Sequence, residues 1–209
     1  MDTYDYSKIS SLEKSYLPSG YAGNVYNMSY KWTSILPPTN KPVKILEIGA
    51  YHGANACCLL KTHATHPDSE LHCLDPWKDS SSYPEYKGQQ AKNYSIFLNN
   101  VSKLSESDLN KVYIHRVSST DIDSLFEDES FDIIYIDGNH TSYFVLQDAV
   151  LSLKKLKVGG TVVFDDVFDK EVRVGLEAFL SVSKDFLDAN VPCSNGQIFL
   201  KKKATMLLS

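Results

Sequence analysis

Three acidic residues follow two apolar segments that have the composition of buried strands. Asp137 comes directly after segment 131–136, and Asp165 and Asp166 end the segment that begins at Thr161. The carboxyl ends of parallel strands open onto one crevice of an α/β sheet, so these carboxylates are expected to converge. Converging carboxylates repel one another unless they are protonated or bridged by a cation. Oxygen ligands suit Mg²⁺, so the sequence predicts a divalent metal site formed by Asp137, Asp165 and Asp166.

A divalent cation in this position would lower the pKa of a bound hydroxyl group and so create a nucleophile. A carboxylate beside that hydroxyl can take its proton, which typically contributes about 10²–10⁴-fold to a rate. We therefore predict Asp137 as both ligand and general base, with His140 as the second candidate base. Simpler roles stay open: Asp137 could cap the following helix, the Asp165–Asp166 pair could bind backbone amides without metal, and His140 could only bond a neighbour.

A glycine turn follows the first apolar strand of the chain. Segment 44–53 runs from apolar residues through Glu47 into the turn between Gly49 and Gly53 and then into a helical pattern. This order builds a nucleotide-sized pocket at the end of a parallel strand. No Gly-Lys-Ser/Thr follows the turn, and Tyr51 occupies the place of the second glycine of a dinucleotide fingerprint. Because Glu47 would repel phosphate, the sequence favours a cationic ligand, such as a sulfonium that carries an amino group.

A further acid ends the second predicted strand, 70–74. Asp75 lies roughly twenty residues beyond the glycine turn, where an acid in nucleoside-binding α/β folds accepts hydrogen bonds from both ribose hydroxyls. The alternative is an aspartate that caps a turn at the strand end. Pro76 and Trp77 follow, and the Trp77 indole could lie against a base, line the entrance or simply pack in the core.

These segments resemble one family. The sequence ILEIGAYHGANA at 45–56 is similar to motif I of class I S-adenosylmethionine-dependent methyltransferases. Segment 137–167 resembles the metal-dependent sugar O-methyltransferases related to macrocin O-methyltransferase, methyltransferase domain family 24, which place an acid-glycine tip and an Asp-Asp tip at this spacing. Segment 117–121 resembles the part that contacts adenine, although Ser118 stands where the family often has an acid. The likeness covers about residues 43–182.

The resemblance implies a set of residues for the methyl donor. They are Glu47, Gly49, Ala50, Tyr51, His52, Gly53, Asp75, Pro76, Trp77, Ser118, Ser119 and Asp137. Ser119 could equally be a helix cap.

The implied activity is S-adenosylmethionine-dependent O-methylation of a hydroxyl on a sugar or glycoconjugate, for example a 6-deoxyhexose such as rhamnose, with Mg²⁺ or another divalent cation. Catechol-type relatives usually have Asp-Asn at the second tip, so Asp166 favours carbohydrate. The alternatives are an O-methyltransferase of a phenolic or other small metabolite, and a non-catalytic scaffold that binds S-adenosylmethionine.

Strand and helix patterns alternate along the chain, which is typical of a doubly wound α/β fold. We expect strands at 43–48, 70–74, 112–117, 131–136 and 161–165, a hairpin of 190–194 with 197–202, and helices at 53–63, 89–104, near 120–126, 141–156 and 169–182. The pair Gly159–Gly160 predicts a glycine stop for the fourth helix. The prediction is a Rossmann-like, mostly parallel seven-stranded sheet with a C-terminal antiparallel hairpin strand. Residues 1–40 form a small cap, and residues 41–209 form the methyltransferase domain.

Acceptor choice is expected in the segments outside the predicted core. These are residues 1–40 and loop 78–88, where tyrosines offer flat faces that suit a sugar ring. The tyrosines are Tyr16, Tyr21, Tyr26, Tyr83 and Tyr86.

Charge and composition narrow the partners. A formal net charge of −5 without a basic stripe argues against a nucleic-acid partner. The basic run 201–203 is expected to be a solvated edge, and His63 and His66 are expected at the surface. The cysteines lack metal spacing, and no signal peptide or membrane span is evident, so we expect a cytoplasmic protein without a membrane partner. Its partner is a small-molecule or glycan acceptor, and it would act as a homodimer or as a domain of a larger glycan-building protein.

Overall fold

The computed structural model describes residues 32–81, 84–188, 191–193 and 196–206. Most of the predicted cap at 1–40 therefore lies outside the described residues, as do Tyr16, Tyr21, Tyr26 and Tyr83. Residues 32–35 form a short helix that precedes the first strand. Within the described part of the chain, every helix is too short or too polar to cross a lipid bilayer.

One sheet of seven strands organises the fold, in the order β3-β2-β1-β4-β5-β7-β6. The strands are β1 (Lys44–Ile48), β2 (Glu70–Leu74), β3 (Val112–His115), β4 (Phe131–Ile136), β5 (Leu156–Phe164), β6 (Val191–Cys193) and β7 (Gln197–Lys201). Strands β1 to β5 pair in parallel, whereas β7 is antiparallel to both of its neighbours. The predicted Rossmann-like sheet with an antiparallel strand near the C-terminus is confirmed.

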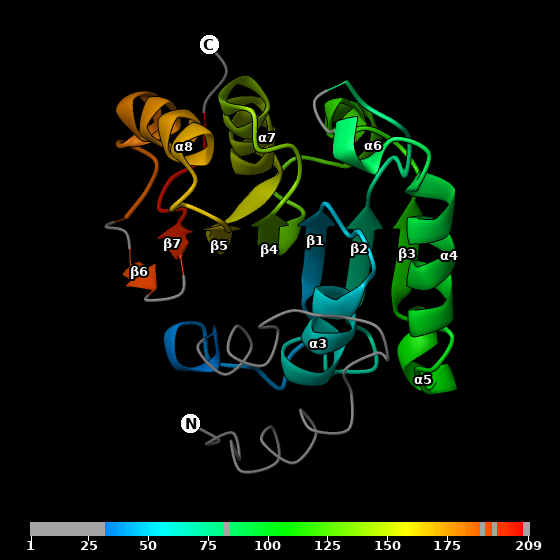
Figure 1. The fold of residues 1–209 in the computed structure, drawn as a ribbon. Helices are drawn as coiled ribbons and strands as arrows, with labels where there is room; N and C mark the ends of the chain where they lie inside the picture. The colour runs from blue at the N-terminus through cyan, green and yellow to red at the C-terminus, as the bar shows by residue number, and fades with distance from the viewer. Residues whose placement is uncertain (1–31, 82–83, 189–190, 194–195, 207–209) are drawn as a thin grey trace.

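Helices cover both faces of the sheet (Figure 1). They are α3 (Ala54–Thr62), α4 (Gln90–Val101), α5 (Glu106–Leu109), α6 (Ile122–Leu125), α7 (Ser142–Lys155) and α8 (Lys170–Ser183), with 3-10 turns η1 (Pro84–Tyr86) and η2 (Ser119–Asp121). Helices α6, α7 and α8 lie on one side, and α3 lies on the other with residues 32–35 (Figure 1). The Asp169 side chain accepts hydrogen bonds from two backbone N–H groups of the first turn of α8, which explains where α8 begins.

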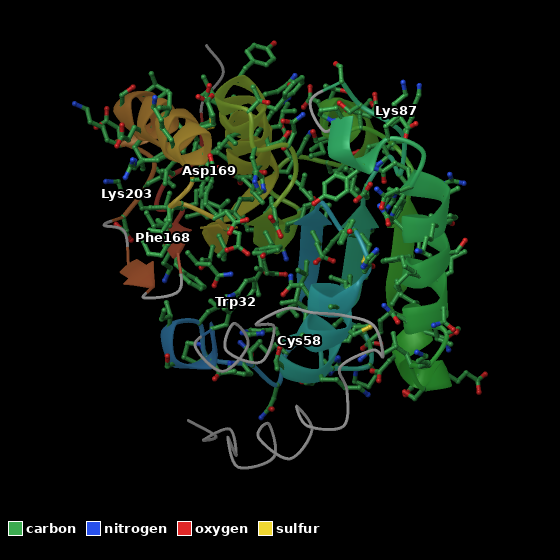
Figure 2. All side chains as sticks on the ribbon, viewed as in Figure 1. Trp32, Cys58, Lys87, Phe168, Asp169 and Lys203 are labelled. Carbon is green, nitrogen blue, oxygen red and sulfur yellow. The ribbon has the colours of Figure 1, made fainter. Side chains whose placement is uncertain are left out.

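The two faces of the sheet carry two separate apolar cores. Alternation along β1 sends Ile45 toward the core under α3 and α4, and Leu46 and Ile48 toward the core under α7 and α8. Tyr135 in β4 belongs to the first core, and Figure 2 shows Trp32 between its short helix and the sheet. The alternation therefore places Glu47 and Tyr135 on the α3 side, because both residues share the parity of Ile45.

The predicted glycine stop of α7 is wrong. Helix α7 ends at Lys155, and β5 begins at the next residue, earlier than the expected strand 161–165. Gly159, with φ +85°, and Gly160 lie inside β5, where its register against β4 shifts. A Cβ atom on Gly160 would approach the Asp132 carbonyl oxygen to 2.9 Å, so this glycine serves a close strand contact and not a helix end.

Two polar residues that were expected at the surface are buried. The His63 ring is 2% exposed, its Nε2 lies 2.9 Å from the Leu36 carbonyl oxygen, and burial lowers its pKa to about 4. The Lys202 side chain is 1% exposed, and its ammonium group donates to the carbonyl oxygens of Leu153 and Leu156 at 2.9 and 2.7 Å. Its Nζ also lies 3.1 Å from Glu129 Oε1. Sequence patterning cannot distinguish such an anchored lysine from its solvated neighbours.

We expect Lys202→Ala to lower the free energy of unfolding by about 3 kcal/mol, because it leaves the Leu153 and Leu156 carbonyls and Glu129 without their cation. Lys201→Ala is the matched control: Lys201 is exposed, and its loss should cost within about 0.5 kcal/mol. Urea denaturation followed by circular dichroism measures both. Equal effects of the two substitutions would contradict the anchoring role of Lys202.

Candidate active site

The glycine turn brings the ends of β1 and β4 into direct contact. Gly49 has φ +89°, and its N–H donates to the Leu74 carbonyl oxygen at 2.8 Å. A Cβ atom on Gly49 would come within 2.0 Å of the Asp137 carbonyl oxygen, closer than any side chain allows. Gly53, with φ +76°, is restricted in the same way by the Phe97 ring, which a Cβ atom would approach to 2.7 Å. Both glycines are therefore required by the turn itself.

Glu47 lies beneath this turn as a buried acid. It is 1% exposed, and its Oε1 accepts a hydrogen bond of 2.9 Å from the Asn55 side chain. Its Oε2 is buried without a hydrogen-bond partner among the described residues. Burial raises the pKa of Glu47 to about 8, against the opposing effect of Asn55. A cationic group beside Oε2 would favour the ionised form.

Asp75 is fixed by two backbone N–H groups at the end of β2. Its Oδ2 accepts from Tyr51 at 2.9 Å and its Oδ1 accepts from Trp77 at 2.7 Å. The Trp77 indole, 4% exposed, packs against Phe97 and donates from Nε1 to the Tyr51 carbonyl oxygen at 2.8 Å. Trp77 thus braces the glycine turn from within the core, and each Asp75 oxygen retains a lone pair for a ligand.

The other predicted donor-binding residues lie around the same turn. The His52 ring stacks on Tyr51 with centroids 3.8 Å apart, and its Nε2 lies 3.1 Å from Asn93 Oδ1. Ala50 is buried and Pro76 is exposed. Ser118 caps η2, because its hydroxyl accepts from the Thr120 N–H, whereas Ser119 lies near Asp148 and lowers the pKa of that carboxyl group, which burial raises.

The ends of β4 and β5 bring together Asp137, His140 and Asp166. One ligand atom from each of these residues lies within 4.8 Å of the others. His140 Nε2 is 3.3 Å from Asp137 Oδ1 and 3.7 Å from Asp166 Oδ2. Two of the three predicted metal ligands are thus grouped with the residue that was predicted as second candidate base.

Asp165 has other partners. Its carboxyl group accepts a hydrogen bond from the Tyr135 hydroxyl, and its Oδ1 accepts from the Asp166 N–H at 2.8 Å. The Gln197 side chain lies beside Asp165, where it lowers the pKa of the Asp165 carboxyl group, and it accepts from Trp32 Nε1 at 2.8 Å. Asp165 therefore belongs to a buried network behind the cluster of Asp137, His140 and Asp166.

Protonation in this cluster is shared between carboxylate and imidazole. Burial raises the pKa of Asp137 to about 6, and nearby Asp165 and Asp166 add to this effect. The hydrogen bond to Asp137 raises the pKa of His140 above its ordinary value. A protonated His140 between two carboxylates occupies the electrostatic role that a cation would take. Cation binding is therefore expected to release a proton.

Tyr135 and Gln197 were not predicted as site residues. A sequence signal existed for Tyr135: it lies two residues before Asp137 in a strand, so both side chains point to one face. Its hydroxyl lies 3.3 Å from Asp137 Oδ2. Gln197 gave no such signal, because only the pairing of β5 with β7 brings it to the site. Phe168 lies two residues after Asp166 in the sequence, and its side chain is 74% exposed (Figure 2). It was also not predicted as a site residue.

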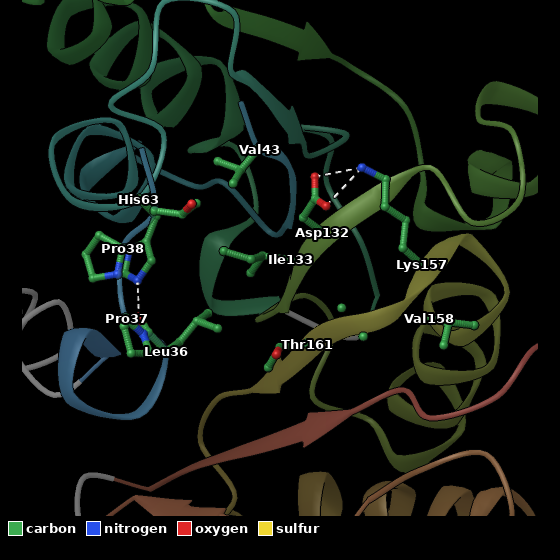
Figure 3. Close-up of a pocket in the computed structure, with 13 residues that line it drawn as sticks. Leu36, Pro37, Pro38, Val43, His63, Asp132, Ile133, Lys157, Val158 and Thr161 are labelled. Atoms are coloured by element: carbon green, nitrogen blue, oxygen red, sulfur yellow. Dashed lines mark hydrogen bonds and ion pairs between the residues drawn. The ribbon is translucent and has the colours of Figure 1, made fainter. Parts of the chain in front are cut away.

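A cavity of about 300 Å³ lies at the opposite edge of the sheet (Figure 3). Val43, Asp132 and Ile133 at the amino ends of β1 and β4 help to line it, so it is separate from the glycine turn. Lys157 donates to both Asp132 oxygens at 2.9 Å, which neutralises the charges on its wall.

Comparison with known proteins gives the class of the chain. The family model described as "Methyltransferase domain" matches residues 46–167, more than half of the chain, so the chain belongs to this family. The predicted membership of a methyltransferase family is confirmed. Among curated proteins, none matches the chain in sequence.

Solved structures share the fold at low sequence identity. The O-methyltransferase TomG from Streptomyces achromogenes, in complex with SAM, is 15% identical, with 97% of this chain and 92% of that chain covered and a TM-score of 0.63. An O-methyltransferase from Bacillus cereus, in complex with SAH, is 18% identical, with 97% and 93% covered and a TM-score of 0.58. These likenesses confirm the α/β architecture.

We expect Glu47→Gln to stabilise the ligand-free protein at neutral and alkaline pH. The folded-state pKa of Glu47, about 8, lies above its ordinary 4.5. The contribution of Glu47 to the free energy of unfolding is therefore greatest below pH 4.5 and is lost as pH rises toward 8. At pH 7 the penalty that glutamine removes is about 3 kcal/mol, at 1.36 kcal/mol per pKa unit. Thermal unfolding from pH 5 to pH 8 measures it. A gain of equal size at both ends of this range would contradict an ionisation effect.

Proposed function

We propose that the protein is an S-adenosylmethionine-dependent O-methyltransferase that acts, with a divalent cation, on a hydroxyl group of a sugar or glycoconjugate. The observation that carries this proposal is the meeting of Asp137, His140 and Asp166 beside the glycine turn. Membership of the methyltransferase domain family supports methyl transfer. Fold neighbours described in complex with SAM and SAH support the choice of methyl donor.

The residues of the glycine turn fit the methyl donor. The unpartnered Oε2 of Glu47 is complementary to a cationic group, and S-adenosylmethionine carries both an ammonium and a sulfonium. The Asp75 carboxylate, held by two N–H groups, can accept from the hydroxyls of a ribose. The absence of a side chain on Gly49 admits the Asp137 carbonyl oxygen and so keeps the turn next to Asp137.

The acidic cluster fits a divalent cation. Asp137 and Asp166 supply oxygen ligands, and His140 supplies either a nitrogen ligand or a base. Mg²⁺ suits the carboxylates, and a set that includes imidazole also suits Mn²⁺. Asp165 was predicted as a third ligand. Because Tyr135 and the Asp166 N–H already donate to its oxygens, we infer that it supports the cluster and does not bind the cation.

The groups at the site divide the chemistry among them. When bound, S-adenosylmethionine presents a methyl group on positive sulfur, and a divalent cation lowers the pKa of the acceptor hydroxyl. Methyl transfer would break the methyl–sulfur bond as the oxygen–methyl bond forms, with S-adenosylhomocysteine as the leaving group. The hydroxyl proton goes to the Asp137 carboxylate or to His140 Nε2. Because these two groups lie 3.3 Å apart, either one can pass the proton to the other.

A sugar acceptor is supported by the adjacent Asp165 and Asp166, which match the Asp-Asp tip of the sugar O-methyltransferases. Exposed aromatic side chains are also available for a sugar ring: Phe168 is 74% exposed, Tyr51 38% and Tyr86 36%. The same rings could accept a phenolic or other small metabolite, which is the alternative acceptor class. A non-catalytic scaffold remains the alternative of another class. A reducing compartment such as the cytoplasm is part of the proposal, supported by the free thiols of Cys57 and Cys73.

We expect Asp137→Asn to reduce methyl transfer by at least about 100-fold while S-adenosylhomocysteine affinity changes by less than about threefold. The reason is that the substitution removes a base and ligand without removing volume. Transfer of labelled methyl from S-adenosylmethionine to panels of sugars, glycosides and catechols measures activity, and calorimetry measures affinity. Asp121→Asn is the control, because Asp121 is exposed and its side chain caps nothing. Undiminished transfer by Asp137→Asn would contradict the role of Asp137 as base and ligand. Transfer to catechols alone would favour the phenolic alternative.

We expect cation affinity to rise as the pH passes about 6 and continues upward, because Asp137, with a pKa of about 6, and His140, with a raised pKa, must lose their shared proton. Calorimetric titration with Mn²⁺ and Mg²⁺ measures this affinity without turnover. EDTA should abolish methyl transfer, and either cation should restore it. Full activity in EDTA would remove the metal from the proposal.

A further inference from the structure

One buried tyrosine contacts acids from two neighbouring strand tips. Tyr135 lies in β4 and is 1% exposed. Its hydroxyl donates a hydrogen bond to Asp165 and lies 3.3 Å from Asp137 Oδ2. The other oxygen of Asp137, Oδ1, lies 3.3 Å from His140 Nε2. Asp137 therefore has the Tyr135 hydroxyl beside one oxygen and the imidazole of the cluster beside the other.

Asp165 extends this contact to another member of the cluster. Its Oδ1 accepts a hydrogen bond of 2.8 Å from the backbone N–H of Asp166. Asp166 has φ +51°, in the left-handed region, which costs a residue with a side chain about 1 kcal/mol. The Asp169 N–H also donates to the Asp166 carbonyl oxygen at 2.7 Å. A backbone conformation of this kind persists only where its surroundings fix it, and the Asp165 side chain is one of the groups that do so.

The left-handed backbone decides where the Asp166 carboxylate lies. Its Oδ2 is 3.7 Å from His140 Nε2, the same nitrogen that Asp137 Oδ1 approaches. Because side-chain direction depends on backbone conformation, an extended Asp166 would direct its carboxylate elsewhere. Tyr135 and Asp165 thus contact the side chain of one acid of the cluster and the backbone of the other.

We propose that Tyr135 is a positioning residue for the acidic cluster, acting on Asp137 directly and on Asp166 through Asp165. The inference rests on the proposed function, because that proposal assigns the cluster to a cation. Metal ligands are commonly held by further hydrogen-bond partners, and loss of one such partner typically costs about 10- to 100-fold in metal affinity. A phenol suits this place, because its ring packs on Trp32 while its hydroxyl reaches the acids.

The competing explanation is that Tyr135 is a core residue whose hydroxyl only satisfies a buried carboxylate. Its ring belongs to the apolar core under α3, which agrees with that view. The two explanations differ in what loss of the hydroxyl changes. A core residue contributes to the free energy of unfolding alone, whereas a positioning residue also changes the affinity of the cluster for a cation.

The experiment uses Tyr135→Phe, which removes the hydroxyl and keeps the packed ring. In calorimetric titration with Mn²⁺, this variant should bind the cation about tenfold or more weakly, while its affinity for S-adenosylhomocysteine changes by less than about twofold. Asp165→Ala should weaken Mn²⁺ binding as well. The double variant should lose less than the product of the two single effects, because both residues act through one contact chain. Tyr113→Phe is the matched control: Tyr113 lies in β3 at the edge of the sheet, is 43% exposed, and its variant should bind Mn²⁺ as the wild-type chain does.

A second measurement needs no cation. The Asp166 N–H, which donates to Asp165, should exchange slowly with solvent hydrogen in the wild-type chain. Tyr135→Phe should speed this exchange by about fivefold or more, because Asp165 loses the hydroxyl that holds it. Amide hydrogen exchange followed by NMR gives both rates.

Each outcome decides the question. Wild-type Mn²⁺ affinity in Tyr135→Phe would assign Tyr135 to the core alone, and single effects that multiply fully in the double variant would overturn the route through Asp165. If Asp165→Ala does not fold, Tyr135→Phe and the exchange rate of Asp166 still test the proposal. Failure of the wild-type chain to bind Mn²⁺ would refute the cation in the proposed function. Exchange at Asp166 would then decide the positioning role, and a rate that Tyr135→Phe leaves unchanged would overturn it.

Discussion

A row of backbone hydrogen bonds just beyond the strand ends holds the whole site in place. The N–H of Asp75 donates to His115, that of Gly49 to Leu74, that of Asp137 to Ile48 and that of Asp165 to Ile136, at 2.8–3.1 Å. Each bond joins the first residue after one strand to the last residue of its neighbour. The row therefore aligns an acid or a glycine at four adjacent tips, and it leaves the side chains free for chemistry. The close contact of Gly49 with the Asp137 carbonyl lies at its centre.

This alignment places several acidic side chains close together where they are largely shielded from solvent. Burial raises the pKa of Glu47, Asp75, Asp137 and Asp165, and for Asp137 the neighbouring acids contribute as well. A fold selected only for stability would not place these groups together, because each loses hydration without gaining a full set of partners. Perturbed acids in one crevice are instead typical of sites that receive cations or transfer protons. The site is pre-organised at a cost in stability, which is a common relation between stability and activity.

The sequence predicted the parts of this arrangement that depend on local pattern. Strands β2 and β4 begin and end where the apolar runs do, and the glycine turn could be placed because only glycine suits its backbone. The partners of Asp165 could not be predicted, because Gln197 reaches it only through the pairing of β7 with β5. Lys202 was mistaken for a solvated residue for the same reason: its carbonyl partners lie at the end of α7 and the start of β5, almost fifty residues away. The sequence records residue types, but tertiary pairing decides which polar groups are buried.

Tertiary pairing also connects the site to the segment before β1. Trp32 packs on Tyr135 with ring centroids 5.2 Å apart, and it donates to Gln197, which lies beside Asp165. Tyr135 in turn donates to Asp165 and approaches Asp137. A displacement of residues 32–35 would therefore reach both acids through a single side chain. Because Asp137 also belongs to the cluster with His140 and Asp166, this contact chain links Trp32 to the cluster. The short helix before β1 is therefore connected to the acids through Trp32, Tyr135 and Gln197.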